Sequence, residues 1–198
     1  MAIRVDDLPA LSWTGAEGDF RAWPGGFSLR SAAGVDWINH AWEGTTQHDA
    51  TALVFDAPAT FALSARVTVP GPRTTFDAGV LCVWASPQQW AKLCFEYSPQ
   101  GVPMVVSVVT DGWSDDANAT PIDGSSVWLR IGRSGDGWAF ASSIDGVRWE
   151  FVRLFRFTPG ATVKVGFLAQ SPTGDGATAE FGDVTLVLEA PGDARDGR

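Results

Sequence analysis

Short runs of alternating apolar and polar residues, separated by clusters of Gly, Pro, Asn and Asp, make up most of the chain. This period of two is typical of antiparallel β-strands, and helical periodicity is almost absent. The pattern predicts strands at residues 20–23, 26–31, 36–42, 52–56, 60–69, 78–85, 90–97, 102–110, 126–133, 137–144, 147–156, 161–169 and 178–188. So many short strands favour an all-β fold, a two-sheet antiparallel jelly-roll sandwich, over a small barrel. Because no linker interrupts the pattern, we expect one domain at residues 1–188 and a flexible tail at residues 189–198.

Two turns predict the strand register in the middle of the chain. A Ser-Pro-Gln-Gln turn places Ala85 opposite Trp90, and a Ser-Pro-Gln-Gly turn places Tyr97 opposite Val102. Since alternate side chains point to opposite faces, one face is expected in the core: Val80, Cys82, Trp84, Leu93, Phe95, Tyr97, Met104, Val106 and Val108. The other face is too polar for a core and is expected to meet a ligand: Asp77, Trp90, Lys92, Cys94, Glu96 and Ser107.

Charge and cysteine content narrow the range of partners and compartments. A formal net charge of −9, with only 14 Lys and Arg, argues against a nucleic-acid or anionic-membrane partner. The predicted register places Cys82 and Cys94 on opposite faces, so they should stay unbonded unless a bulge shifts it. Two free thiols, no signal peptide in MAIRVDDLPALSW and no long apolar run lead us to expect a cytoplasmic protein.

Asp77 and Glu96 are the first candidates for chemistry. The predicted register makes them diagonal neighbours, roughly 7–8 Å apart between backbones. Paired carboxylates act as acid and base in glycoside hydrolysis, at about 5–5.5 Å for retention or about 6.5–9.5 Å for inversion. The alternative is an ion pair of Glu96 with Lys92 on an open sheet face. Against catalysis, the Glu-x-Asp-x-x-Glu pattern of jelly-roll glucanases is absent, and Glu96 is the only acid in WAKLCFEYS.

Tryptophan and histidine residues supply further candidates for ligand contacts. Alternation places Trp90 on the same strand face as a lysine two residues away, and Trp128 on the same face as Arg130. Their rings are therefore expected at a site rather than in the core. Trp42 and His48 lie in the segment WINHAWEGTTQHDA, which we interpret as a polar loop at the rim of that site. The spacing of the two histidines matches no zinc pattern, so no metal site is expected.

The acid-rich stretch TDGWSDDAN, with its acidic residues at 111–118, leaves calcium as an open question. Its Asp and Asn side chains offer oxygen ligands, but the EF-hand spacing is missing and turns favour these residues anyway. Catalytic Ser/His/Asp and Cys/His arrangements, phosphate loops and dinucleotide fingerprints are all absent from the sequence. No cofactor is therefore expected.

The stretch SIDGVRWEF, residues 143–151, predicts a hairpin. Asp-Gly is the strongest signal for a two-residue type I′ turn with both residues at positive φ. That turn would pair Ile144 with Val147 and would place Trp149 on the core side. The likeness of this stretch to the Asp motifs of sialidases is superficial, because the spacing differs.

Five ordered motifs run through the chain: Asp77 and Gly79; Trp90, Lys92 and Glu96; Val108 to Thr110 with Ser114 and Asp115; Trp128 to Arg130; and Ser143 to Trp149. In this order they resemble the family of domains of unknown function numbered 1349 (DUF1349), also called the regulation of enolase protein family. The resemblance covers about residues 20–188 and implies a concanavalin A-like jelly-roll fold. Asp116 departs from the pattern, since the family implies an aromatic residue there. The family implies little about activity, because fold alone does not give function.

The sequence thus leads to one functional prediction and two alternatives. We expect binding of a carbohydrate or another small polar ligand on the concave sheet, through Trp90, Lys92, Glu96, Asp77, Trp128, Arg130, Trp42 and His48. The first alternative is a glycoside hydrolase or a small-molecule tailoring enzyme that uses Glu96 and Asp77 as acid and base. The second is a non-catalytic protein-interaction module. An exposed edge strand could also support a homodimer.

Overall fold

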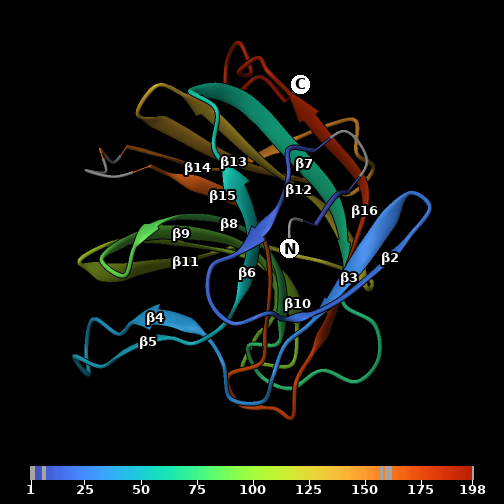
Figure 1. Cartoon of the computed structure of the whole chain (residues 1–198), viewed down its shortest axis with the longest axis vertical. Coiled ribbons are helices and arrows are strands. Elements are labelled where there is room, and N and C mark those ends of the chain that lie inside the picture. The colour runs from blue at the N-terminus through green and yellow to red at the C-terminus, as the bar shows by residue number, and fades with distance from the viewer. Residues whose placement is uncertain (1–2, 6–7, 157, 159–161, 198) are drawn as a thin grey trace.

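The protein is described by a computed structural model over residues 3–5, 8–156, 158 and 162–197 (Figure 1). All regular structure in these residues is β. The strands are β1 (Ser12–Trp13), β2 (Asp19–Trp23), β3 (Gly26–Arg30), β4 (Trp37–Asn39), β5 (Thr46–His48), β6 (Ala52–Asp56), β7 (Thr60–Thr68), β8 (Ala78–Ser86), β9 (Gln89–Tyr97), β10 (Pro103–Asp111), β11 (Trp113–Pro121), β12 (Ser126–Ser134), β13 (Gly137–Ser143), β14 (Glu150–Arg156), β15 (Lys164–Gln170) and β16 (Thr178–Val187). Residue 161, the first of a predicted strand, lies outside the described residues.

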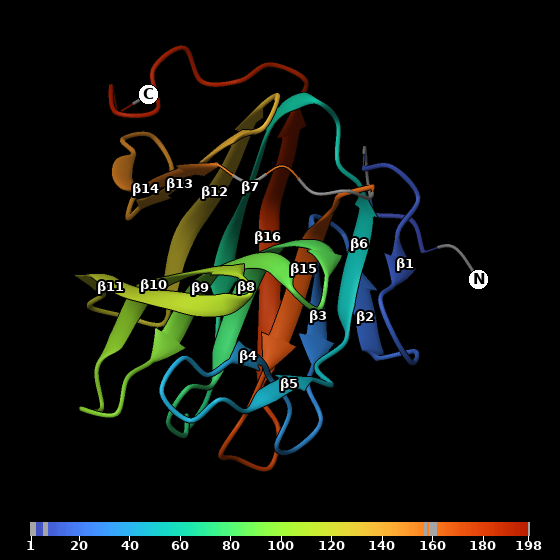
Figure 2. The ribbon, with the colours of Figure 1, turned by 90° about the vertical axis from the view of Figure 1, so that its left-hand side faces the viewer.

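Two seven-stranded antiparallel sheets pack face to face, which confirms the predicted all-β sandwich. The first sheet has the strand order β1-β6-β15-β8-β9-β10-β11, and the second sheet has the order β14-β13-β12-β7-β16-β3-β2. A two-stranded hairpin, β4–β5, packs on the outer face of the first sheet (Figure 2). Many neighbouring strands are far apart in sequence, so the fold depends on long-range pairing as well as on hairpins.

Apolar side chains from alternate strand positions fill the space between the two sheets. Leu93 and Phe95 of β9 lie in this core, as the alternation predicts. Phe27, Phe167 and Phe181 form an aromatic group within it, with ring centroids 5.0 to 5.2 Å apart. Full burial of each such ring contributes roughly 1.5–3 kcal/mol to stability, so this core supplies the main driving force for folding.

A second apolar cluster lies on the outer face of the first sheet, beneath β4–β5. Trp37 of β4 packs against Trp84 and Trp90, with ring centroids 4.5 and 6.1 Å away. The indole Nε1 of Trp37 donates a hydrogen bond to the backbone oxygen of Ala50. The middle strands of the first sheet are therefore apolar on both faces. The expectation of an open polar face is wrong where this hairpin covers the sheet.

The register predicted around β9 is wrong by one residue on each side. An irregularity in β8 after Trp84 places Trp84, not Ala85, opposite Trp90. At the next turn the partner of Tyr97 is Pro103, one residue later than predicted. A slip of one residue turns side chains to the other face. The following residues therefore lie on the outer face of the first sheet and not between the sheets: Val80, Cys82, Trp84, Met104, Val106 and Val108.

The corrected register also moves Cys82 and Ser107, while Cys94 lies on the outer face as predicted. Cys82 and Cys94 lie on the same face, within the outer apolar cluster. Both are free, as predicted, although the opposite-face argument for this was wrong. Burial raises the pKa of each thiol, which leaves little reactive thiolate near neutral pH. Ser107 pairs with Leu93 and so faces inward rather than outward.

The sequence pattern does not predict β1, β5 or β11. β11 runs through the acid-rich stretch, so residues 113–121 form an edge strand of the first sheet and not a loop. Polar residues on both faces of this strand hide its alternation. Among the residues that the structure describes, no group of three or more His, Cys, Asp or Glu side chains is placed to hold a metal ion.

The predicted two-residue turn within residues 143–151 is wrong. A longer loop joins β13 to β14, and within this fully described stretch only Gly146 has a positive φ, 73°. The carboxylate of Asp145 accepts hydrogen bonds from the backbone N–H groups two and three residues ahead, a common role of Asp in turns. Trp149 lies outside the core, with the guanidinium of Arg130 4.2 Å from its ring centroid.

The C-terminal residues contact the second sheet. The backbone oxygen of Gly197 accepts a hydrogen bond from the N–H of Trp149. The guanidinium of Arg195 lies 5.4 Å from the ring centroid of Phe151 on β14. The flexibility expected of this tail stays a prediction. The described part of the chain contains no helix of the length and apolarity that crossing a membrane requires.

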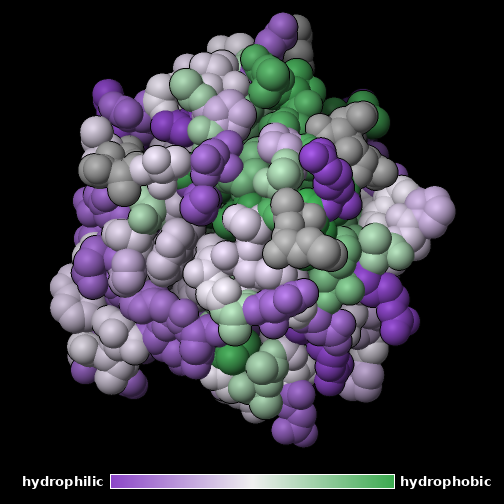
Figure 3. All heavy atoms as spheres, viewed as in Figure 1, coloured by the Kyte–Doolittle hydropathy of each residue, from purple (hydrophilic) through white to green (hydrophobic). Residues whose placement is uncertain are grey.

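Hydrophilic and hydrophobic residues are mixed on the surface shown in Figure 3, with hydrophobic residues gathered toward the top and centre. Val187 and Leu188, at the end of β16, are 50% and 68% exposed. Ile144 and Val147, in the loop before β14, are also exposed. Scattered exposed apolar residues are normal for a globular protein, so the protein-interaction alternative stays a prediction.

Candidate functional site

A cleft of about 350 Å³ opens on the outer face of the first sheet, beside the β4–β5 hairpin. Residues of β9, β10 and β11 form its floor, and residues of the β4 segment and of the turn after β9 form its walls. The register aligns two rows of residues across these strands: Lys92, Val108 and Asp116, then Cys94, Val106 and Asn118. All of them except the fully buried Cys94 line the cleft. The cleft thus combines an apolar strip with charged and amide groups.

Lys92 is held at the bottom of the cleft by three hydrogen bonds. Its Nζ lies 2.7 Å from Oδ1 of Asp36, 2.7 Å from the backbone oxygen of Trp37 and 2.9 Å from Oε1 of Gln170. All three ammonium donors are therefore used. Burial opposes the charge of Lys92, but the nearby acidic groups, Asp36 first, raise its pKa above the ordinary value. The ion-pair partner of Lys92 is thus Asp36 and not Glu96.

Glu96 projects into the cleft from the far end of β9. Its residue is only 9% exposed, yet its carboxylate makes no hydrogen bond or ion pair with the described residues. Burial raises the pKa of Glu96 to about 7; Lys92 opposes this shift and Asp36 adds to it. A carboxyl group that is partly protonated near neutral pH can accept or donate a hydrogen bond, and such groups concentrate at functional sites.

Asp116 and Asn118 complete the cleft on β11, and the sequence analysis did not select them as site residues. Asp116 is an exposed residue, but the protein atoms around the cleft partly desolvate its carboxylate and raise its pKa, and the nearby Asp36 adds to this shift. Alternation along β11 turns Ser114, Asp116 and Asn118 to one face. Reading the acid-rich stretch as a strand would have revealed them. Asp116, which departs from the family pattern, therefore lines the cleft.

Asp77 does not line the cleft. Its carboxylate accepts hydrogen bonds from the Oγ of Ser171 at 2.6 Å and from the backbone N–H of Thr74 at 2.8 Å. The residue is 3% exposed, and its carboxylate joins the turn before β8 to the end of β15 through these hydrogen bonds. The structure does not bring Asp77 and Glu96 together as a carboxylate pair facing one ligand.

Trp90 lies under the hairpin, and His48 of β5, which is half-buried, packs on it from the hairpin. Trp90 is fully buried, and the imidazole of His48 packs edge-on to its ring at 6.4 Å. The Nε2 of His48 lies 2.7 Å from Oδ1 of Asn39, whose amide donates to two backbone oxygens around β11 and the β8–β9 turn. Burial lowers the pKa of His48. These side chains hold the hairpin on the sheet, and Trp90 offers no exposed ring for stacking.

The remaining predicted site residues are divided between the two sides of the molecule. Trp128 and Arg130 belong to β12 in the second sheet, so they are not walls of the cleft. Trp42 lies in the turn between β4 and β5 and is 96% exposed. It lines a hollow that adjoins the cleft. Of the predicted set, therefore, Lys92 and Glu96 line the cleft and Trp42 lies beside it.

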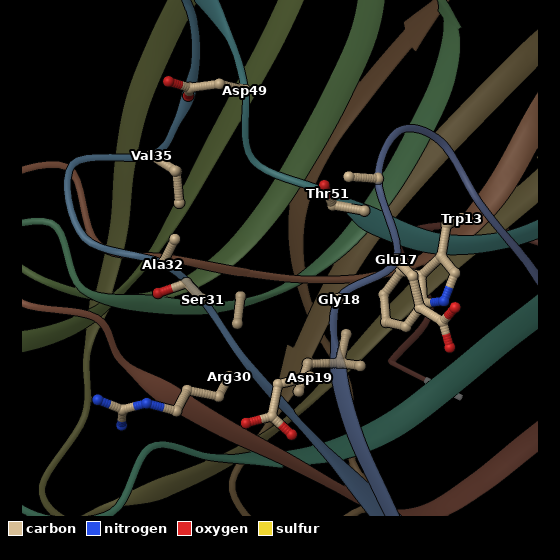
Figure 4. Close-up of a pocket in the computed structure, with 13 residues that line it drawn as sticks. Trp13, Glu17, Gly18, Asp19, Arg30, Ser31, Ala32, Val35, Asp49 and Thr51 are labelled. Carbon is tan, nitrogen blue, oxygen red and sulfur yellow. The ribbon is translucent and has the colours of Figure 1, made fainter.

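A separate cavity of about 440 Å³ lies between the loop after β1 and the segments around β3 (Figure 4). Glu17, Asp19, Arg30 and Asp49 surround it, and all four are exposed. None of these residues was expected at a site from the sequence. Because well-solvated charges contribute little specificity, the cleft with the buried Glu96 is the stronger candidate site.

Comparison with known families decides where the chain belongs. The family model described as "Protein of unknown function (DUF1349)" matches residues 13–187. The chain belongs to the DUF1349 family. The resemblance inferred from the five motifs is therefore confirmed. A search of the curated proteins gave no match.

Solved structures similar to this DUF1349 protein share its fold. A functionally unknown protein from Saccharomyces cerevisiae has a TM-score of 0.81 and 24% identity, covering 91% of this chain and 96% of that one. The GH43 BlXynB protein from Bacillus licheniformis has a TM-score of 0.63 and 16% identity, covering 81% of this chain and 33% of that one. Xylan β-1,4-xylosidase from Bacillus halodurans C-125 has a TM-score of 0.62 and 13% identity, covering 79% and 31%. This chain thus spans about a third of the two glycosidases, and the likeness shows the fold alone.

The DUF1349 motifs have two distinct roles in this chain. Lys92 and Glu96 line the cleft. Trp90 and Ser114 instead hold the hairpin, since Trp90 packs against it and the Oγ of Ser114 accepts a hydrogen bond from the N–H of Asn39 at 3.0 Å. Neighbouring residues of one motif therefore have different roles: some hold the β4–β5 hairpin on the sheet, and others line the cleft.

Proposed function

We propose that this DUF1349 protein binds a carbohydrate or another small polar ligand in the cleft above β9, β10 and β11. One observation carries the proposal: Glu96 is only 9% exposed, lines the cleft and makes no hydrogen bond or ion pair with the described residues. A largely buried acid whose carboxylate meets only the cleft is well placed to accept hydrogen bonds from a ligand. Sugar hydroxyls supply them well.

The composition of the cleft supports a ligand with both polar and apolar surface. Val106 and Val108 offer an apolar strip to the C–H face of a sugar ring. Glu96 and Asp116 would accept hydrogen bonds from hydroxyls, and the amide of Asn118 could donate or accept. The volume of about 350 Å³ lies within the lower part of the range for small-molecule sites.

The charges of the cleft favour a neutral ligand over an anionic one. The ammonium of Lys92 is saturated by Asp36 and two oxygen acceptors, so it is not available to an acidic group of a ligand. Glu96 and Asp116 carry no ion-pair partner among the described residues and would repel such a group. From the sequence, Lys92 and Arg130 were expected to contact the ligand through its acidic or hydroxyl groups, but Lys92 is occupied by protein acceptors and Arg130 belongs to the second sheet.

Isothermal titration with neutral sugars tests the proposal. Glucose, xylose and their β-1,4-linked disaccharides are titrated into the wild type, into Glu96→Gln and into the control Glu180→Gln on the second sheet. We expect at least one sugar to bind, and we expect Glu96→Gln, but not Glu180→Gln, to weaken that binding about tenfold. Binding that Glu96→Gln leaves intact would refute the role of Glu96, and no binding by any of these sugars at millimolar concentration would refute a neutral carbohydrate as the ligand.

An acid–base enzyme is the second candidate, and the raised pKa of Glu96, about 7, favours it. The partner expected from the sequence, Asp77, is engaged elsewhere, and Asp116 is the other carboxylate that lines the cleft without an ion pair among the described residues. Hydrolysis of p-nitrophenyl glycosides checks this candidate. An enzyme would release nitrophenol, and Glu96→Gln would abolish release while the substrate still binds. A binding protein would show no release with any glycoside.

A further inference from the structure

Trp42 is the most exposed large hydrophobic residue of the described chain, at 96%. It lies in the turn between β4 and β5 and belongs to neither apolar cluster. Leaving an indole ring in water forfeits the free energy that burial would provide, and folding gains nothing from it at this position. An exposed tryptophan at the mouth of a cleft therefore suggests a contact made only with a ligand.

Backbone hydrogen bonds fix the base of the turn that carries Trp42. The N–H of His40 donates to the backbone oxygen of Thr45, and the N–H of Gly44 donates back to the oxygen of His40, each at 2.8 Å. Gly44 has a φ of 69°, a conformation that favours glycine. Below the turn, Asn39 donates to Gly112 and receives support from β11. The ring of Trp42 is therefore presented by an ordered turn.

A hollow of about 490 Å³ lies beside Trp42 and adjoins the Glu96 cleft. The two hollows share Ile38, His40 and Asp116 as common walls. Asp115, which also lines the outer hollow, is paired with Arg153 at 3.0 Å. Because these residues line both hollows, the two are adjacent and together form a groove, with Glu96 in one part and Trp42 in the other.

We propose that the ligand is a neutral oligosaccharide of at least two rings, one bound at Glu96 and the next stacked on Trp42. This proposal rests on the proposed carbohydrate-binding function of the cleft. Trp42 would contact the apolar face of the outer ring, while Asp116 and His40, between the hollows, would contact its hydroxyls. Neutral sugars fit because Glu96, Asp115 and Asp116 line the groove and would disfavour uronic or sulfated rings.

A comparison of mono- and disaccharides tests the proposal. Glucose is compared with cellobiose, and xylose with xylobiose, by titration and by tryptophan fluorescence on the full chain. The variants are Trp42→Ala, Trp42→Phe, and the control Trp23→Ala, which removes a 40% exposed tryptophan from the second sheet. We expect a disaccharide to bind about tenfold more tightly than its monosaccharide, because the second ring adds a stacking contact.

The outcomes separate this proposal from the one it rests on. If it holds, Trp42→Ala lowers disaccharide affinity to that of the monosaccharide and leaves monosaccharide affinity unchanged, Trp42→Phe keeps part of the gain, and Trp23→Ala has no effect. Equal affinity for one and two rings, or a disaccharide unaffected by Trp42→Ala, overturns the role of Trp42 while the Glu96 site stands. Binding of no sugar at all overturns both.

Discussion

The ammonium of Lys92 lies 2.7 Å from Oδ1 of Asp36, and both side chains are nearly buried, at 3% and 12% exposure. This ion pair joins the middle of β9 to the segment that leads into β4. A second hydrogen bond from Lys92, to the backbone oxygen of Trp37, strengthens the same connection. The pair therefore holds the β4–β5 hairpin on the first sheet and defines one side of the cleft.

Lys92→Met is expected to destabilise the protein by about 3–5 kcal/mol. The substitution leaves the Asp36 carboxylate and the oxygen of Trp37 buried without their donor, and an unpaired buried charge is costly. Urea unfolding gives the free energy. The matched control is Lys164→Met, because Lys164 pairs with Asp56 at 2.8 Å on an exposed surface and should cost less than about 1 kcal/mol. Equal costs for the two variants would contradict the buried role of Lys92.

Glu96 should make stability fall as the pH rises between about 4.5 and about 7. Its pKa is about 7 in the folded chain against 4.5 for an ordinary Glu, so the unfolded chain loses this proton first. Over that interval the folded state binds more protons, and the free energy of unfolding declines with pH. The charged groups that shift the pKa of Glu96 are Lys92, Asp36, Asp116 and Arg73, and all four are retained in the Glu96→Gln variant.

The Glu96→Gln variant isolates this effect, since it lacks only the titrating group. The difference in free energy of unfolding, variant minus wild type, should grow from pH 5 to pH 8 by up to about 3 kcal/mol. Urea unfolding at several pH values measures it. A difference that stays constant with pH would mean that Glu96 titrates normally and is better solvated than its burial implies.

Trp90→Ala is expected to act on stability rather than on a ligand directly. Trp90 is fully buried and packs against Trp37, so its truncation leaves a cavity that costs about 3–5 kcal/mol. Thermal unfolding checks this. Trp42→Ala, which removes a 96% exposed ring, should change stability by less than about 0.5 kcal/mol. If Trp90→Ala were as mild as Trp42→Ala, the packing of the hairpin described above would be wrong.

Asp77→Asn should lower stability and leave the affinity of any cleft ligand unchanged. The amide replaces one acceptor by a donor opposite Ser171 or Thr74, and a lost buried hydrogen bond costs about 1–3 kcal/mol. Unfolding and titration are measured on the same preparation, with Asp19→Asn as the exposed control. A loss of affinity without a loss of stability would restore Asp77 to the site.

The sequence alone was sufficient for the fold class, the family and most strands. Alternation and turn residues are local signals, and they identified β9 with Leu93 and Phe95 facing inward. Local signals failed in two places. The irregularity after Trp84 shifts the register of β8 by one residue, and the polar residues of β11 hide its alternation.

The site depended on contacts between distant parts of the chain. Asp36 meets Lys92 across 56 residues, and no pattern near either residue indicates that partnership. The hairpin that buries Trp90 and the strand that brings Asp116 to the cleft are likewise set by tertiary packing. The sequence by itself determined that Glu96 and Lys92 face outward from one strand, because that is a matter of alternation. Only the tertiary structure decided which outward-facing side chains are covered, which are paired and which remain open to a ligand, because burial and pairing depend on what packs above them.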